Sequence, residues 1–185
     1  AYTNRKKMVL VRGFYHGVAP WMQKLGYAGV VEEDLANNLY IDYNAPEQLE
    51  ALCKKYPGQI AGLIATPYFH PTFGDNILPP EGYWQKMRKI CDENGIVLIF
   101  DDVRAGFRID MKGSDYHYGI KSDLSCFCKA IANGYNISCI TGVEKLKNAA
   151  SDIAYTGSYW LSAVPFAAGI ATLKKAKEID AVEGN

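Results

Sequence analysis

Continuous apolar runs alternate along this chain with segments whose apolar residues recur at helical spacing. The continuous runs are typical of buried strands and occur at 8–11, 60–65, 96–100, 124–127 and 137–141. The segments with helical spacing predict helices over 46–56, 80–94 and 162–181. Near-continuous apolar strands that alternate with helices indicate an α/β fold, in which a mainly parallel sheet carries helices on both faces.

Local signals mark the expected ends of two of these helices. Asn44 is expected to cap the helix over 46–56, and Pro57 is expected to end it. Gly95 directly follows the helix over 80–94, which is the usual place for a C-terminal glycine.

Composition excludes several classes of protein. The 185 residues are 49% hydrophobic and 22% charged, which supports a packed core rather than disorder. Twenty basic residues balance twenty acidic ones without a block of like charge, so neither nucleic-acid binding nor a polybasic membrane anchor is supported. No apolar run approaches the roughly 20 residues that cross a bilayer, and the first residues lack a signal-peptide pattern. We therefore expect a cytoplasmic protein whose partner is a small molecule or another protein.

The cysteines form an odd set without CxxC spacing. They are Cys53, Cys91, Cys126, Cys128 and Cys139. This pattern favours reduced thiols in a cytosolic protein over disulfides or a metal site, so no metal ligands are predicted.

Residues that follow predicted strands are the best candidates for function, because ligands of parallel sheets gather beyond the carboxyl ends of the strands. Polar residues follow strands in three places, at 13–17, 101–108 and 129–135. The long irregular loop at 68–80 is a further candidate, since long loops are often functional.

Two of these places carry groups suited to chemistry. Asp101 and Asp102 follow an apolar strand, where a partly buried carboxylate needs a cationic or hydrogen-bonding partner. A helix cap or a structural ion pair would also account for them. Lys129 follows another apolar segment, and a desolvated lysine can act as a nucleophile toward carbonyls. An ordinary surface lysine remains the alternative.

Three motifs together resemble a known family. The segments Phe14-Tyr15-His16-Gly17, Leu98-Ile99-Phe100-Asp101-Asp102-Val103 and Lys129-Ala130-Ile131-Ala132-Asn133-Gly134-Tyr135 are similar to successive signatures of class-III aminotransferases that depend on pyridoxal phosphate (PLP). The continuation Gly106-Phe107-Arg108 resembles the glutamate-1-semialdehyde aminomutase branch. The resemblance implies PLP as cofactor and the PLP-dependent transferase fold of type I.

The resemblance also implies roles for single residues. Lys129 would be the Schiff-base lysine that carries the proton after substrate binds. Asp101 would bind the pyridinium nitrogen, Val103 would press on one face of the ring, and Tyr15 would cover the other. His16 would contact the cofactor or support the Tyr15 loop.

A further motif implies a dimer. Thr156-Gly157-Ser158-Tyr159-Trp160 is similar to the family segment that supplies a hydroxyl to the PLP phosphate of the neighbouring subunit, with Ser158 in that role. A homodimer with shared active sites therefore follows from the likeness. A loop that caps the following helix is the alternative reading of the same residues.

The resemblance covers 1–173, and family members extend beyond this chain on both sides. The chain, 1–185, is therefore expected to be the central part of the PLP-binding large domain, without the N-terminal phosphate-cup segment and the C-terminal small domain. Asp102 departs from the family, because glutamate is usual at this position.

The implied function is transfer of an amino group between an amino acid or amine and a carbonyl compound through Lys129. One alternative is glutamate-1-semialdehyde 2,1-aminomutase, in which the transfer is intramolecular. Another is a truncated, non-catalytic binding domain of the same fold. A Rossmann oxidoreductase is disfavoured, because no GxGxxG follows an early strand.

Overall fold

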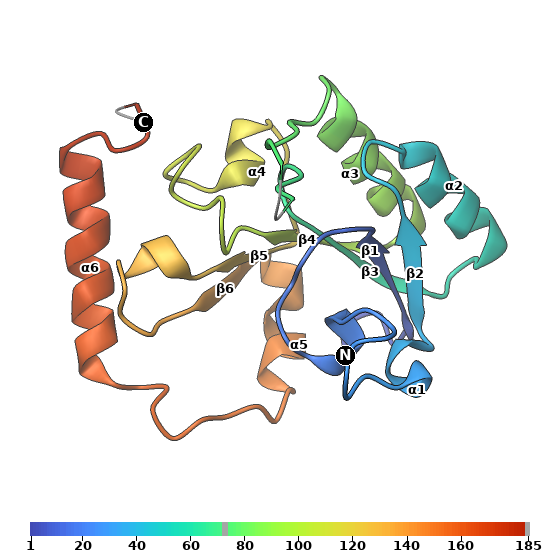
Figure 1. The fold of residues 1–185 in the computed structure, drawn as a ribbon, viewed down its shortest axis with the longest axis horizontal. Helices are drawn as coiled ribbons and strands as arrows, with labels where there is room; N and C mark the ends of the chain where they lie inside the picture. The colour runs from blue at the N-terminus through green and yellow to red at the C-terminus, as the bar shows by residue number, and fades with distance from the viewer. Residues whose placement is uncertain (72–73, 184–185) are drawn as a thin grey trace. The chain divides into compact units, whose positions relative to one another are not determined.

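The computed structural model describes residues 1–71 and 74–183 (Figure 1). The chain divides into two compact units. The N-terminal unit is Thr3–Leu98, and the C-terminal unit is Ile99–Asn185 together with Ala1–Tyr2. The boundary between them falls inside one strand, β4 (Val97–Asp101).

The N-terminal unit is built on three parallel strands in the order β2-β1-β3. Their bounds are β1 Lys7–Val11, β2 Asn38–Ile41 and β3 Ile60–Ala65. Val9 pairs with Leu39 on one side and with Leu63 on the other. The strands predicted at 8–11 and 60–65 are confirmed, whereas β2 was not predicted from the sequence.

Two amphipathic helices, α2 (Pro46–Lys55) and α3 (Tyr83–Asn94), lie side by side in this unit (Figure 1). They bury Leu49 and Cys53 of α2, and Tyr83, Trp84, Met87, Ile90 and Cys91 of α3. A short 3-10 helix, η1 (Pro20–Met22), and a single helical turn, α1 (Glu32–Leu35), precede β2.

The predicted helix ends are partly correct. Gly95 ends α3 in a left-handed conformation with φ 61° and ψ 39°, as the sequence predicts. The expected cap at Asn44 is wrong, because Ala45 is the N-cap residue of α2 and no side chain caps it. Asn44 instead has a left-handed φ of 61°, and Pro46 starts the helix without needing a partner for an N–H group.

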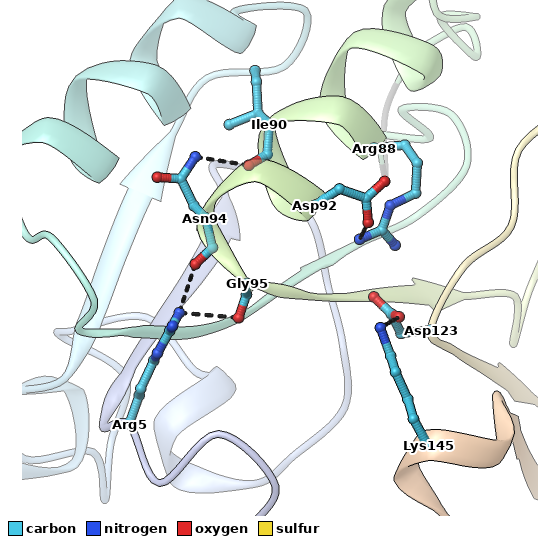
Figure 2. Close-up of polar contacts among 8 residues, drawn as sticks. All are labelled: Arg5, Arg88, Ile90, Asp92, Asn94, Gly95, Asp123 and Lys145. Carbon is cyan, nitrogen blue, oxygen red and sulfur yellow. Dashed lines mark hydrogen bonds and ion pairs between the residues drawn. The ribbon is translucent and has the colours of Figure 1, made fainter.

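Arg5 joins the end of α3 to the start of β3, and Figure 2 shows its contacts with Asn94 and Gly95. Its Nη1 donates to the carbonyl oxygens of Asn94 at 2.8 Å, Gly95 at 3.0 Å and Ile60 at 3.0 Å. The last carbonyl groups of a helix have no partner within the helix and carry partial negative charge. A guanidinium at this position therefore satisfies them and complements the helix dipole.

The C-terminal unit contains the end of β4 (Val97–Asp101), β5 (Leu124–Phe127) and β6 (Cys139–Gly142), in the order β4-β5-β6. β5 runs parallel to β4, and β6 runs antiparallel to β5. A parallel return needs about a dozen residues or more and usually a helix, and only the short 3-10 helix η2 (Lys129–Ile131) lies between β5 and β6. The sheet is therefore mostly parallel with an antiparallel member, which confirms the α/β class.

The core of the C-terminal unit forms where β5 and η2 meet α6 (Ala163–Glu178). Phe127, Ile131 and Ala132 are buried, and Ala168 and Leu173 of α6 pack against them. The remaining elements are α4 (Ser114–His117), η3 (Glu144–Leu146) and α5 (Lys147–Ser151).

An ion pair joins η3 to the start of β5, since Lys145 lies 2.7 Å from the buried carboxylate of Asp123 (Figure 2).

No helix among 1–71 and 74–183 is long and apolar enough to span a membrane.

Two glycines of the C-terminal unit differ in the space around them. A Cβ at Gly106 would lie 2.7 Å from the carbonyl oxygen of Asp102 and 2.7 Å from the ring of Phe127. A Cβ at Gly169 in α6 would meet nothing nearer than 3.6 Å, which is ordinary contact. Gly106 is therefore required by close packing, whereas Gly169 is not.

The Arg5 contacts predict that Arg5→Ala lowers the free energy of unfolding by about 1–3 kcal/mol, because three carbonyl oxygens lose a charged donor. Lys6→Ala is the control, since Lys6 is exposed and adjacent. Thermal and denaturant unfolding of both variants measure the difference. Equal unfolding midpoints for the two variants would contradict the assignment.

Gly106→Ala is expected to destabilise the protein by about 1–3 kcal/mol, because the added methyl group overlaps backbone and ring atoms. Gly169→Ala is expected to be neutral or to stabilise by up to about 1 kcal/mol, since alanine has the higher helix propensity. The two thermal midpoints, measured side by side, check the opposite signs. A midpoint for Gly106→Ala at or above that of the parent protein would show that the site can expand.

Candidate active site

Asp101 is the last residue of β4, and its side chain is held by the turn that follows. The residue is buried, with 8% of its surface exposed. Its Oδ1 accepts a hydrogen bond of 3.1 Å from the backbone N–H of Val103. This local turn is one that aspartate side chains commonly form with the backbone two residues later. The structure thus brings together Asp101 and Val103, two of the predicted site residues.

Lys129 follows β5 and is the first residue of η2. Asp101 of β4 pairs with Cys126 of β5 in parallel register, so Lys129 lies just beyond the strand position opposite Asp101. The side chains of Asp101 and Lys129 therefore follow the carboxyl ends of two neighbouring parallel strands. Lys129 is exposed, in contrast to the buried carboxylate.

The backbone at Lys129 adopts a conformation that is unusual for a residue other than glycine. Its φ of 43° lies in the left-handed region, which costs about 1–3 kcal/mol and persists only when the surroundings impose it. Ile131 and Ala132, which follow it, are buried in the core of the C-terminal unit. The core therefore anchors the turn that presents the lysine.

Asp102 is more deeply buried than Asp101, at 1% exposure, and binds the start of α4. Its Oδ2 accepts the backbone N–H of Ser114 at 2.8 Å, and its Oδ1 accepts the Ser114 hydroxyl. Burial raises the pKa of Asp102, the hydrogen bonds from Ser114 oppose this, and the charges of Asp115 and Asp101 add to it. Asp102 thus binds the first residue of α4 through hydrogen bonds from its backbone N–H and its hydroxyl.

Cys126 lies beside these carboxylates and was not singled out as a site residue from the sequence. The pKa of its thiol is raised to about 11, mainly by burial and in addition by the charges of Asp101, Asp102 and Cys139. The thiol therefore stays protonated under ordinary conditions. The motif spacing does not indicate that Cys126 lies beside Asp101. This position follows from the pairing register of β4 and β5.

All five cysteines are free thiols, as the sequence predicts. Within residues 1–71 and 74–183, no group of three or more His, Cys, Asp or Glu side chains is arranged to hold a metal ion.

Tyr15 and His16 belong to the N-terminal unit and follow β1. Tyr15 is 62% exposed, and His16 is half-buried. Phe14, which precedes them, stacks on Phe69 with ring centroids 5.5 Å apart and meets the ring of His16 edge-on at 6.1 Å. The segment is thus anchored by Phe14 and leaves the phenol of Tyr15 accessible.

An aromatic cluster that the sequence analysis did not identify supports this segment. Tyr43, which follows β2, lies 5.5 Å from Phe14, 5.9 Å from Phe69 and 5.7 Å from Tyr83, measured between ring centroids. Gly13 has a φ of 82°, and a Cβ there would come within 3.3 Å of Phe69. The sequence signal that could have indicated this cluster is an aromatic residue shortly after each of β1, β2 and β3, namely Phe14, Tyr43 and Phe69.

Part of the predicted loop at 68–80 belongs to the same region. Phe69 and Ile77 form an antiparallel bridge, and the Tyr43 hydroxyl donates to the carbonyl of Ile77 at 3.2 Å. Residues 72–73 of this loop lie outside the described residues.

Ser158 lies in the segment between α5 and α6 and is exposed. Its neighbours Tyr159 and Leu161 are 88% and 90% exposed. Its predicted contact with a cofactor phosphate requires a second subunit and stays a prediction.

The groups at the ends of β4 and β5 match what PLP requires. The cofactor needs an anion at its ring nitrogen, an amine for its aldehyde and an apolar contact on the ring face. Asp101 is a buried carboxylate, Lys129 is an accessible amine after the neighbouring strand, and Val103 is a branched apolar residue in the same turn as Asp101. The residues present therefore fit the cofactor.

Comparisons with known proteins agree with this chemistry. The family model described as "Aminotransferase class-III" matches residues 2–184. Aminopentol aminotransferase of Sphingopyxis macrogoltabida is 43% identical over 99% of this chain and 43% of that protein. Glutamate-1-semialdehyde 2,1-aminomutase of Methanococcus maripaludis is 34% identical over 93% of this chain and 43% of that protein.

A solved structure gives the same result for the fold. The PLP internal aldimine form of the FumI protein of Sphingopyxis sp. MTA144 is 44% identical and superposes with a TM-score of 0.91 over 96% of this chain and 42% of that chain. The type I fold expected for PLP-dependent transferases is thereby confirmed.

The chain spans less than half the length of these relatives. Its residues, its fold and its relatives together establish that the chain belongs to the class-III aminotransferase family, whose cofactor is pyridoxal phosphate.

Proposed function

We propose that this chain is part of an aminotransferase that moves an amino group between an amino acid or amine and a carbonyl compound. The observation that carries the proposal is the placement of Asp101 and Lys129 at the carboxyl ends of the neighbouring parallel strands β4 and β5. A carboxylate and an amine at this edge of a parallel sheet are the pair that PLP chemistry needs.

Each residue would contribute a distinct part of the reaction. Bound PLP supplies an aldehyde that condenses with amines and a ring that withdraws electrons from the reacting carbon. The buried Asp101 carboxylate would hold the ring nitrogen in its protonated form. The Nζ of Lys129 would hold the cofactor in the resting enzyme and would move a proton at the substrate carbon. Val103 packs against one face of the ring.

The remaining predicted residues would complete the site. The family resemblance implies that the exposed Tyr15 would cover the other ring face and that His16 would hold the Tyr15 segment or contact the cofactor. Ser158 donates its hydroxyl to the phosphate in the second subunit of a homodimer. The exposed apolar side chains of Tyr159 and Leu161 support this dimer, because such residues are commonly covered by a partner.

We also propose the place of the chain in the whole protein. Residues 1–185 form the central part of the PLP-binding large domain, which is consistent with a match to 42–43% of the length of relatives. The five free thiols fit a reducing compartment, so the proposed location is the cytoplasm.

The second candidate is an aminomutase, which returns the amino group to the adjacent carbon of the same molecule. The identity of 31–34% to several glutamate-1-semialdehyde aminomutases favours it. The identity of 43% to aminopentol aminotransferase is higher and favours transfer between two molecules, with an amine as a donor class.

Lys129→Ala is expected to abolish the visible absorbance of lysine-bound PLP and to reduce amino transfer by several orders of magnitude, because no other group supplies the amine. The measurement is the absorbance spectrum and turnover of the complete natural protein with added PLP. Lys147→Ala is the control, since Lys147 is an exposed lysine of the same unit that pairs with Glu144. An unchanged spectrum in Lys129→Ala would refute the assignment.

The two candidate reactions are expected to differ in their need for an acceptor. A transaminase stops after one turnover unless a carbonyl acceptor is added, whereas a mutase continues. Steady-state product formation from an amine donor, with and without a keto-acid acceptor, distinguishes them. We expect turnover that depends on the acceptor. Sustained conversion of glutamate-1-semialdehyde without an acceptor would contradict the aminotransferase and support the aminomutase.

A further inference from the structure

Asp102 is held at both its backbone and its side chain. Its carbonyl oxygen accepts the N–H of Gly106 at 2.8 Å, and its carboxylate accepts both the N–H and the hydroxyl of Ser114. With 1% of its surface exposed, its carboxylate has hardly any access to water, so these protein donors have to replace the water that burial removes.

The position of Asp102 determines what this restraint does. Asp102 lies between Asp101 and Val103, which are linked by the hydrogen bond from the Val103 N–H to Asp101 Oδ1. These residues form a closed turn with Asp102 at its centre. A shift of Asp102 would therefore rotate the Asp101 carboxylate and the Val103 side chain together.

The surroundings of Asp102 are shaped for this close approach. Gly113, which precedes Ser114, has a φ of 115°, and a Cβ there would lie 3.5 Å from Asp102 Oδ2 and 3.1 Å from Asp115 Oδ1. A side chain at Gly113 would be strained in backbone conformation and would lie tightly against Asp115, whereas its contact with Asp102 would be ordinary. The chain thus brings the start of α4 against Asp102 through a residue without a side chain.

A second carboxylate–serine contact lies nearby but does not involve the turn at the end of β4. Asp115 Oδ2 accepts the N–H of Ser122 at 3.0 Å and its hydroxyl at 2.9 Å. Ser122 is buried, like Ser114, and its hydroxyl also meets that of Ser125 at 2.7 Å. The two serines make the same type of contact, and only the Ser114 contact acts on the residue between Asp101 and Val103.

We propose that Asp102 is a positioning residue: anchored to Ser114, it fixes the direction in which Asp101 and Val103 leave β4 toward the cofactor ring. The inference rests on the proposed function and adds to it a residue that touches no reacting atom. Preorganised sites require such supporting contacts, because a side chain that presents a catalytic group has to be held itself. The short side chain of Asp102 meets Ser114 directly.

The test compares Ser114→Ala with Ser122→Ala in the complete natural protein. Each variant removes one buried hydroxyl that donates to a carboxylate, so both are expected to lower the thermal midpoint of the cofactor-free protein to a similar extent. Only Ser114→Ala is expected to weaken PLP binding, by about tenfold, and to shift the absorbance maximum of the bound cofactor. Titration with PLP and the spectrum of the loaded protein give these two values.

Asp102→Asn provides a second variant that keeps the shape of the side chain. An asparagine can accept from the Ser114 N–H and donate to the Ser114 hydroxyl oxygen, so it is expected to bind PLP within about threefold of the parent protein. Asp102→Ala combined with Ser114→Ala is expected to be no worse than Asp102→Ala alone, because both remove the same contact.

The outcomes separate this inference from the proposed function. If the parent protein shows a PLP spectrum that Lys129→Ala abolishes, together with acceptor-dependent turnover, the proposed function stands. Equal effects of Ser114→Ala and Ser122→Ala on PLP affinity and spectrum would then overturn the positioning role alone. Absence of any Lys129-dependent spectrum would overturn both.

Discussion

The parallel register between β4 and β5 determines where the candidate catalytic groups of the C-terminal unit lie. Asp101 pairs with Cys126, so the turn after β4 and the turn after β5 leave the sheet at the same edge. Parallel pairing makes this unavoidable, because the carboxyl ends of parallel strands point in the same direction. The turn that carries Asp101 and the turn that carries Lys129 therefore follow neighbouring strands at the same edge of the sheet.

Desolvation gives this edge its electrostatic character. Asp101 and Asp102 are adjacent and buried, and their charges raise the pKa of the Cys126 thiol beyond the effect of its own burial. Buried like charges oppose one another, so each needs donors from the protein. Ser114 and the Val103 N–H supply them. The polar contacts that stabilise the turn are therefore also those that orient Asp101, the carboxylate proposed to bind the cofactor.

The fold was readable from the sequence where burial on both sides demands apolar side chains. The central strands β1, β3 and β4 are continuous apolar runs for this reason, and α3 shows its buried face in its spacing. β2 was missed because an outer strand is only half-buried, and its sequence Asn-Leu-Tyr-Ile needs no continuous apolar run. The cap at Asn44 was misassigned because Asn44 adopts a left-handed conformation and Pro46 begins the helix.

For the site, the sequence by itself determined which chemistry is present: an acid after one strand, a lysine after another, and motifs in the order of one family. It did so because strand ends and turn residues are local features that neighbouring residues encode. Only the tertiary structure decided that Asp102 meets Ser114, that Cys126 lies beside Asp101 and that β6 runs antiparallel. These depend on packing between segments distant in the chain, and the free energy of such contacts comes from burial that no local pattern records.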